Sequence, residues 1–363
     1  MSHKILELKQ EIETKEELWH YLRIAMEVEL STIPTYLCAI YSLKPDSNQA
    51  ARQVMHSVVI EEMLHLTLAG NVLRATGGLA QLNSKEFVPS YPTPLPDSDI
   101  PGFKVPLQKF GRDALDVFKR IELPSRPKDK PDAFGWHTIG QFYDGLQQGI
   151  DKLCDKLGTA EVFDGRVEDQ IWPDDYYGGS GEVVVVANED PETAHVNAKR
   201  AMDEIVNQGE GMHHEVMDGD HIPGKGDQEF PVPAHYFRFD EVCRERYYKA
   251  DDAPGKPTGA VLHVDWEDVY NMQKNPMMHN YDEGSEIYAA MLDFNRTYMG
   301  LLNLLNDAFN KDRTLLMKAV GVMYDLKYKA VALMKTPSGD GDTTVGPSFE
   351  FVEHCTGSGG EKG

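Results

Sequence analysis

The sequence has few cysteines, and they stand far apart. Its 363 residues include four cysteines, and none lies in the Cys-x-x-Cys spacing of a zinc ribbon or a redox dithiol. Isolated thiols are typical of proteins from a reducing compartment, so we expect a cytoplasmic protein. A chain of this length buries roughly three quarters of the surface that its unfolded form exposes. It therefore needs neither disulfides nor a structural metal to fold, and a bound metal would have to serve chemistry.

Basic charge is also scarce relative to acidic charge. The chain has 36 Lys and Arg against 59 Asp and Glu, a formal net charge of −23 at pH 7. This charge repels phosphate backbones and anionic surfaces, which argues against a nucleic-acid or membrane partner. No apolar run is long enough to cross a bilayer, and the first residues are acidic where a secretory signal needs an apolar core. Metal cations suit this acidic composition better as bound partners.

Apolar residues at helical spacing are the dominant pattern that is present. They predict a mainly α protein, a helical bundle over residues 1–335 with a C-terminal tail at 336–363. We expect two long loop inserts, one Pro-rich and one Gly- and Pro-rich, and a short strand. The inserts lie at 88–106 and 219–233, and the strand at 183–186. Bundle helices are expected at about 14–43, 47–75, 138–157 and 191–217, and further helices at about 282–309 and 311–334.

Glu29 lies inside the apolar stripe of the first helix. Leu22, Ala25, Ile33 and Tyr36 lie one or two turns away on the same face. An ionised carboxylate buried there without a partner costs several kcal/mol, so it needs a cation, an Arg partner or a proton. Tyr36 is a candidate to donate a hydrogen bond or an electron at such a site, although ordinary core packing explains it as well.

The second helix repeats this anomaly with two residues. Glu62 and His65 stand three apart on its apolar face, so the carboxylate and the imidazole lie one turn apart and can bind one ion. Dimetal carboxylate bundles use such Glu-x-x-His pairs on two helices and a lone Glu on each of two others. Glu61 also lies within reach of His65, and we interpret it as a supporting or solvent-facing partner.

The helix at 191–217 supplies a second candidate set. Glu210 in QGEG and His213 are again three residues apart. The flanking glycines loosen the helix, so its register stays open. His213 is therefore either the second imidazole or part of a solvated turn. His235, at the start of the next apolar segment, is the competing imidazole.

The helix at 138–157 lacks an obvious acidic ligand. Gln141 and Asp144 are its candidates, and both project away from the apolar stripe. A glutamine coordinates only through a neutral carbonyl. We therefore expect either one metal or two unequally bound metals, with Gln141, Asp144 or no residue contributing from this helix.

Several motifs together resemble a known family. The stretches MEVELSTIPTYLCAIYSL and VVIEEMLHLTLAGNVLRATGG are similar to the ferritin-like domain of the iminophenylpyruvate dimer synthase family, which takes part in bisindole pigment biosynthesis. TIGQFYDGL, IVNQGEG, AHYFRF and GPSFEF extend the resemblance over nearly the whole chain. The resemblance implies a ferritin-like four-helix bundle. It also implies metal-site roles for Glu29, Glu62, His65, Glu210 and His235, which favours His235 over His213. The family commonly has an acidic residue where this sequence has Gln141.

These features predict a non-haem iron oxidoreductase that uses dioxygen and acts on a small organic molecule, plausibly in secondary-metabolite biosynthesis. The donor set accepts manganese or copper as well as iron, and the ion count is one or two. One alternative is an iron-binding or ferroxidase protein without an organic substrate. The other is a non-catalytic scaffold, and a homo-oligomer stays open in each case.

Overall fold

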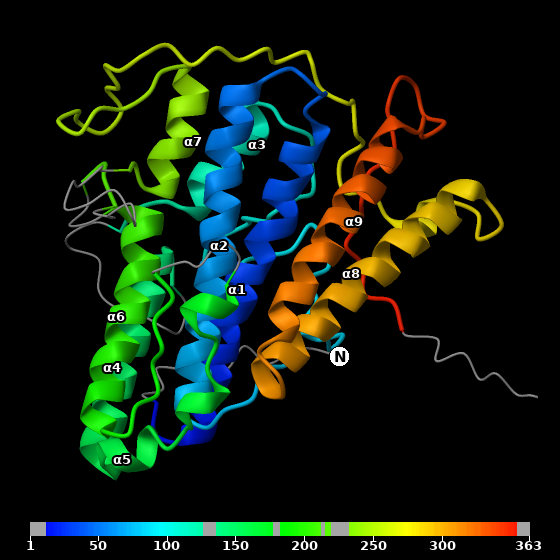
Figure 1. Ribbon diagram of the computed structural model, residues 1–363. Helices are drawn as coiled ribbons and strands as arrows, with labels where there is room; N and C mark the ends of the chain where they lie inside the picture. The colour runs from blue at the N-terminus through cyan, green and yellow to red at the C-terminus, as the bar shows by residue number, and fades with distance from the viewer. Residues whose placement is uncertain (1–11, 126–135, 177–181, 212–214, 219–231, 354–363) are drawn as a thin grey trace, which may run out of the picture.

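The computed structural model describes residues 12–125, 136–176, 182–211, 215–218 and 232–353. Over these residues the protein is mainly helical, as expected (Figure 1). The principal helices are α1 (Lys15–Ser42), α2 (Gln49–Ala75), α3 (Arg112–Ile121), α4 (Ile139–Leu157), α5 (Thr159–Val162), α6 (Pro191–Glu210), α7 (His235–Arg244), α8 (Glu286–Asn310) and α9 (Leu315–Lys335).

The helices α1 and α2 form the long central pair of the bundle. Helix α1 begins at the expected capping box, in which the Thr14 side chain accepts from the Glu17 backbone N–H and the Glu17 side chain accepts from that of Thr14. Helix α2 ends before Gly77, whose φ of +81° is easily adopted only by a glycine. The two helices bury apolar faces against each other, which fixes the residues that share the bundle interior.

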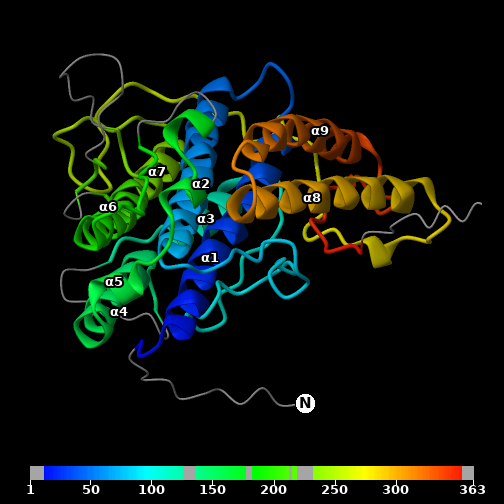
Figure 2. The same cartoon turned by 60° about the horizontal axis from the view of Figure 1, so that its bottom comes forward.

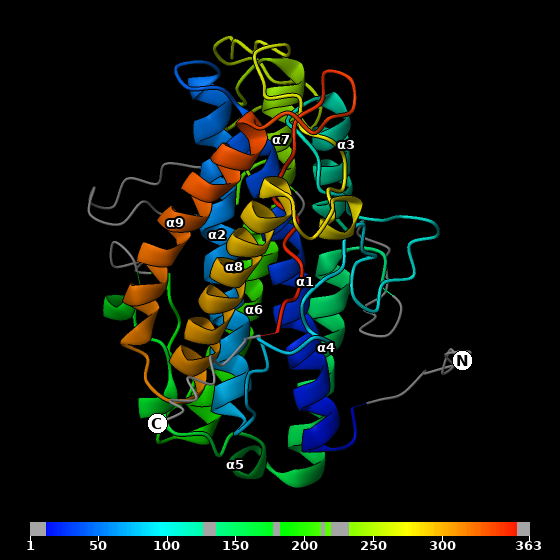
Figure 3. The ribbon, with the colours of Figure 1, turned by 90° about the vertical axis from the view of Figure 1, so that its right-hand side faces the viewer.

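The other two positions of the bundle are each filled by two consecutive helices. Helices α3 and α4 both pack against α1, and α6 and α7 both pack against α2. Figures 1 and 3 show α3 above α4 and α7 above α6. The chain is thus interrupted twice at one level of the bundle, and helix ends face the interior there. Helix ends present unpaired backbone groups and side chains that a continuous helix would not.

A hairpin of α8 and α9 covers the outer side of α1 and α2 (Figure 2). Asparagines of α8 hold the loop after α2, because Asn310 Oδ1 accepts from the Ala80 N–H at 3.0 Å and Asn306 Oδ1 accepts from the Leu82 N–H at 3.1 Å. This hairpin leaves the bundle interior enclosed by α1, α2, α3, α4, α6 and α7. No described helix combines the length and the apolar character needed to span a membrane.

The structure differs from the sequence-based expectation at three places. Helix α6 ends at Glu210 rather than near 217, because Gly211 adopts a φ of +95°. Helix α3 lies in a stretch for which no helix was expected. The expected strand Val183–Val186 is absent from the described residues. Its backbone is satisfied by side chains of other segments, since Val184 O accepts from Asn71 and the Val186 N–H donates to Gln170.

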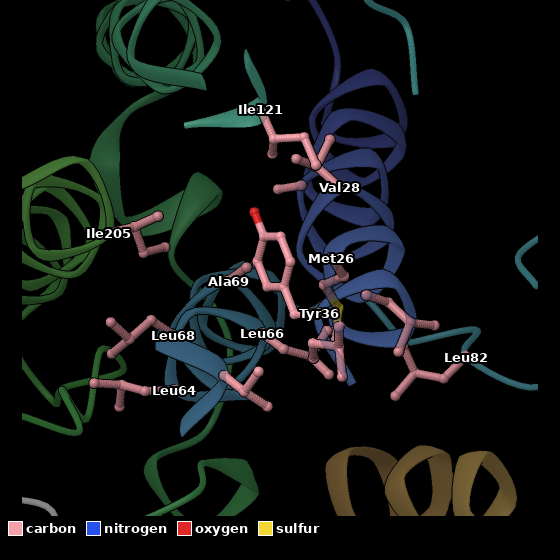
Figure 4. Packing of buried hydrophobic residues seen from close by; sticks show 14 of the residues in the cluster. Met26, Val28, Tyr36, Leu64, Leu66, Leu68, Ala69, Leu82, Ile121 and Ile205 are labelled. Atoms are coloured by element: carbon pink, nitrogen blue, oxygen red, sulfur yellow. The ribbon is translucent and has the colours of Figure 1, made fainter. Parts of the chain in front are cut away.

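The apolar core extends through the bundle up to the level of these helix breaks. In Figure 4 the ring of Tyr36 lies among core side chains, and its hydroxyl points into the space between Ile121 and Ile205. The Tyr36 ring also packs on Phe118 of α3 and Phe239 of α7. The core therefore directs a phenol toward the level where the helices are interrupted.

Candidate metal centre

Acidic and imidazole side chains from five segments meet inside the bundle at the level of the helix breaks. Each is at most 3% exposed. Burying such groups as unpaired charges costs several kcal/mol apiece, so the cluster requires protons, counter-charges or a cation. The members are Glu29 of α1, Glu62 and His65 of α2, Glu122 just after α3, Glu210 at the end of α6 and His235 at the start of α7.

Glu62 lies at the centre of the cluster. Its Oε1 lies 2.9 Å from His235 Nδ1 and 4.0 Å from His65 Nδ1. Its Oε2 accepts a hydrogen bond of 2.8 Å from the Thr32 hydroxyl. One ligand atom from each of Glu62, His65 and His235 lies within 4.8 Å of the others, which is close enough to hold one ion among them. Carboxylate and imidazole donors of this kind suit iron, manganese, copper and zinc.

Two further carboxylates flank this group, one beside each histidine. Glu29 Oε2 lies 3.5 Å from His65 Nδ1, and Glu122 Oε2 lies 3.7 Å from His235 Nδ1. The two imidazole rings stack with a centroid separation of 5.2 Å. The site therefore has two halves that share Glu62, each with one imidazole and one carboxylate of its own.

Both histidines direct Nδ1 at the shared carboxylate because their Nε2 atoms are engaged elsewhere. His235 Nε2 lies 2.9 Å from Glu61 Oε2, and an ionised carboxylate only accepts, so this nitrogen carries a hydrogen. His65 Nε2 lies 2.9 Å from Gln208 Oε1. The Gln208 amide group donates to Glu204 Oε1 at 3.1 Å, which fixes its oxygen toward His65. Nδ1 is thus the nitrogen free to bind a metal on each ring.

An orphaned nitrogen and a small cavity show that the residues fit a metal ion. Among the described residues His235 Nδ1 has no hydrogen-bond partner, although Glu62 Oε1 is only 2.9 Å away, because the two groups are not aligned for a hydrogen bond. A cavity of about 10 Å³ lies beside the cluster, which is space for roughly one water molecule or small ion. These donor atoms converge without bonding to one another, and a metal ion among them would satisfy them.

In the absence of a cation, protons neutralise the cluster. Burial, followed by the charge of Glu122, raises the pKa of Glu62 to about 7, although His235 opposes this shift. Burial lowers the pKa of His235, but the neighbouring carboxylates of Glu122, Glu61 and Glu62 outweigh it, so the pKa stands well above its ordinary value. The pKa of His65 is likewise raised, since Glu29 and Glu62 outweigh burial. A metal would displace these protons, which couples its binding to pH.

Glu61 belongs to a buried chain of charges behind His235. Its Oε1 accepts from Arg238 Nη1 at 2.7 Å, and Arg238 Nη2 lies 3.0 Å from Asp218 Oδ2. Burial would raise the pKa of Glu61, but the charge of Arg238 and the hydrogen bond from His235 lower it to about 2. Glu61 therefore stays ionised and holds His235 in one orientation. The sequence pairs Glu61 with His65, whereas the structure pairs it with His235.

Glu210 also lines the cavity, and backbone N–H groups hold its carboxylate in place. It accepts from the Gly140 N–H at 2.6 Å and from the Ser125 N–H at 2.8 Å. Burial raises the pKa of Glu210 to about 7 against these hydrogen bonds, which lower it. A side chain at position 140 would displace this carboxylate, because an added Cβ would lie 2.6 Å from Glu210 Oε2.

Two buried tyrosines donate hydrogen bonds to the flanking carboxylates. The Tyr143 hydroxyl donates to Glu29 Oε1 at 2.6 Å, and the Tyr36 hydroxyl donates to Glu122 Oε1. Burial, with the charges of the neighbouring glutamates, raises the pKa of both phenols well above the ordinary value. Each phenol thus stays protonated and fixes one oxygen of its glutamate, which leaves the other oxygen facing a histidine.

The structure brings most of the candidate residues together. Asp144 is exposed on the outer face of α4 and lies outside the cluster, and Gln141 Oε1 accepts from the His137 N–H at the start of that helix. His213 lies outside the described residues. The residues placed at the cluster are Glu29, Glu62, His65, Glu210, His235 and Tyr36.

The sequence interpretation missed Glu122 and the role of Tyr143. In both cases the sequence contains a pattern that could have identified the residue. Phe118, Ile121 and Glu122 lie on one face of α3 at helical spacing, so Glu122 continues an apolar stripe as Glu29 does. Tyr143 lies within the apolar stripe of α4, where a buried hydroxyl needs a partner. Glu122 supplies the acidic group that α4 lacks.

A helical bundle in which carboxylates and imidazoles from facing helices meet in the core is the architecture of ferritin-like proteins. The chain belongs to the Ferritin-like family, because the model of that family matches residues 22–244. Among solved structures it is similar to a ferritin-like protein from Caulobacter vibrioides, with 22% sequence identity and a TM-score of 0.63 over 92% of this chain and 98% of that chain. At this identity the likeness shows the fold alone. No curated protein matches. The ferritin-like part of the resemblance seen in the sequence is thereby confirmed.

Proposed function

We propose that this protein is a metal-dependent oxidoreductase that holds one or two non-haem iron ions and uses dioxygen to oxidise a small organic molecule. The observation that carries the proposal is the buried group of Glu62, His65 and His235, flanked by Glu29 and Glu122. Two imidazoles with several carboxylates are the donor set of ferritin-like dimetal proteins. Manganese and copper are accepted by the same donors.

The site suits redox chemistry because its donors are buried, so a bound metal would be shielded from bulk water. Glu29, Glu62 and Glu122 would neutralise the charge of the ion, and His65 and His235 would hold it through Nδ1. When bound, iron would supply one-electron redox chemistry and open positions for small ligands. Ile139, Ile205, Val206 and Gly209 also line the cavity, so part of the space around a bound ion would be apolar.

The substrate class rests on the motif resemblance. The motifs around Glu29, Glu62, Glu210 and His235 are similar to those of the iminophenylpyruvate dimer synthase family, and this similarity supports a small organic substrate in secondary-metabolite biosynthesis. The α8–α9 hairpin and the long loops add far more chain than a simple storage bundle uses. Both features support an enzyme with an organic substrate.

A second candidate function is that of a ferroxidase, which oxidises iron as its own substrate. The size of the cavity favours it, since about 10 Å³ holds an ion and no organic molecule. The two candidates differ in what they consume. A ferroxidase takes up dioxygen in proportion to added iron(II), whereas an oxidoreductase continues to turn over with a fixed amount of iron and an organic reductant or substrate.

The test is metal analysis of the purified protein followed by oxygen uptake. We expect stoichiometric iron, manganese or copper in the wild type and a loss of at least tenfold in bound metal in Glu62→Gln and His65→Ala. Glu192→Gln is a matched control, because Glu192 is an exposed glutamate on α6. Full metal content in both site variants would refute the assignment of the site. Stoichiometric metal without any oxygen uptake would refute the oxidoreductase.

A further inference from the structure

We infer that the two halves of the site bind metal unequally, and that Glu61 makes the half with His235 the first to fill. The inference rests on the metal binding proposed above, but not on any reaction. The half with His235 consists of His235, Glu122 and the shared Glu62. The half with His65 consists of His65, Glu29 and the same Glu62.

The two imidazoles differ in the group that accepts from their outer nitrogen. His235 Nε2 donates to the Glu61 carboxylate at 2.9 Å, whereas His65 Nε2 donates to the neutral Gln208 amide oxygen at 2.9 Å. An imidazole that donates to a carboxylate has more electron density on its other nitrogen and is the stronger metal ligand. The outer hydrogen bonds have equal lengths, so the difference lies in charge.

Both outer groups are fixed in place, which keeps this difference permanent. Arg238, only 3% exposed, donates to Glu61 Oε1 at 2.7 Å and contacts Asp218 at 3.0 Å, so Glu61 Oε2 is left for His235. Gln208 is buried, and its amide nitrogen donates to Glu204 on the same helix. Glu61 therefore remains the acceptor for His235, and Gln208 remains the acceptor for His65.

The position of the shared carboxylate of Glu62 also favours the half with His235. Glu62 Oε1 is 2.9 Å from His235 Nδ1 but 4.0 Å from His65 Nδ1. The flanking carboxylates Glu29 and Glu122 do not offset this difference in distance, because each accepts a hydrogen bond from a tyrosine with one oxygen and has the other oxygen near its histidine. The half with His235 thus combines the more basic imidazole with the nearer shared ligand.

The variant Glu61→Gln tests the charge of this residue with little change in its size. The substituted amide has one acceptor oxygen, and Arg238 is the neighbour that must donate to it. Its NH₂ group then faces His235 Nε2, which has to accept, so the ring loses its proton at Nε2 and keeps one only at Nδ1. In the wild type Nδ1 gives up its proton to a metal while Nε2 keeps one, whereas in the variant Nδ1 holds the last proton of the ring and gives it up less readily.

The experiment uses the full-length protein freed of metal with a chelator. Cobalt(II) is titrated by calorimetry and visible absorption, and the histidine tautomers of the metal-free protein are read by ¹⁵N NMR, with His235→Asn to assign the signal. We expect two steps in the wild type. Glu61→Gln should weaken the first step about 10- to 100-fold and leave the second within about threefold. Gln208→Ala should weaken only the second step, and Glu192→Gln neither. In Glu61→Gln, Nε2 of His235 should lose its proton while Nδ1 carries one.

Several outcomes would overturn the inference. They are a single binding step that requires both histidines, equal affinities for two ions, or a first step that is unchanged in Glu61→Gln. A proton that stays on His235 Nε2 would overturn the role of Glu61 even if affinity fell, because a general loss of structure lowers affinity without requiring Nε2 to accept. Two unequal steps in a protein that never consumes oxygen would sustain this inference and refute the proposed oxidoreductase.

Discussion

Glu62→Gln should stabilise the metal-free protein, and the gain should grow with pH. Burial and the charge of Glu122 raise the pKa of Glu62 from 4.5 to about 7. Between these two values the folded protein binds more protons than the unfolded chain, so the free energy of unfolding falls as pH rises. The neutral amide of Gln at position 62 does not ionise, so the variant does not lose this stability as pH rises. Its oxygen can still accept from the Thr32 hydroxyl, as Glu62 does.

The magnitude follows from the size of the pKa shift. At about 1.4 kcal/mol per pKa unit, the cost of ionising Glu62 is under about 1 kcal/mol at pH 5 and approaches about 3 kcal/mol at pH 8. We therefore expect Glu62→Gln to exceed the wild type in stability by roughly 2 kcal/mol more at pH 8 than at pH 5. Metal at about 1,000 times its dissociation constant should reverse the order, because it stabilises only the protein that binds it, by roughly 4.1 kcal/mol.

The assay is urea unfolding of both proteins at pH 5 and pH 8, with chelator and with zinc(II). Glu192→Gln serves as the control, since that exposed carboxylate should give the same difference from the wild type at both pH values. The reasoning fails if Glu62→Gln differs from the wild type equally at the two pH values. It also fails if zinc stabilises the variant as much as it stabilises the wild type.

Three other substitutions test neighbouring parts of the structure. Gly140→Ala should lower the melting temperature, since its Cβ would lie 2.6 Å from Glu210 Oε2; an unchanged melting temperature would contradict the close packing. Tyr143→Phe removes the 2.6 Å donor to Glu29 and should cost about 1 to 3 kcal/mol in urea unfolding at pH 8; stability equal to that of the wild type would count against the bond. Burial raises the pKa of Glu241 to about 7, so Glu241→Gln should gain stability relative to the wild type as pH rises from 5 to 8, by up to about 3 kcal/mol. A difference independent of pH in thermal scans would refute that shift.

The sequence predicted the helical elements well wherever a long apolar stripe ran without interruption. Helices α1 and α2 begin and end within two residues of the predicted limits. The prediction of a mainly helical, ferritin-like bundle is confirmed. Short elements were less predictable. Helix α3 has only ten residues, and the extended segment Val183–Val186 is held by side chains from distant segments rather than by a neighbouring strand.

Helical periodicity by itself determined that Glu29, Glu62 and His65 face the interior of the bundle, because residues three and four apart on a long helix must share a face. Only the tertiary structure decided which groups join them. Glu122 and His235 stand at the ends of short helices, and long connections separate them from α1 and α2, so no local spacing fixes their distance to Glu62. The partner of Glu61 was decided in the same way, since packing of α7 against α2 brings His235 and Arg238 to it. Periodicity acts within one element, whereas a metal centre is made by the docking of several.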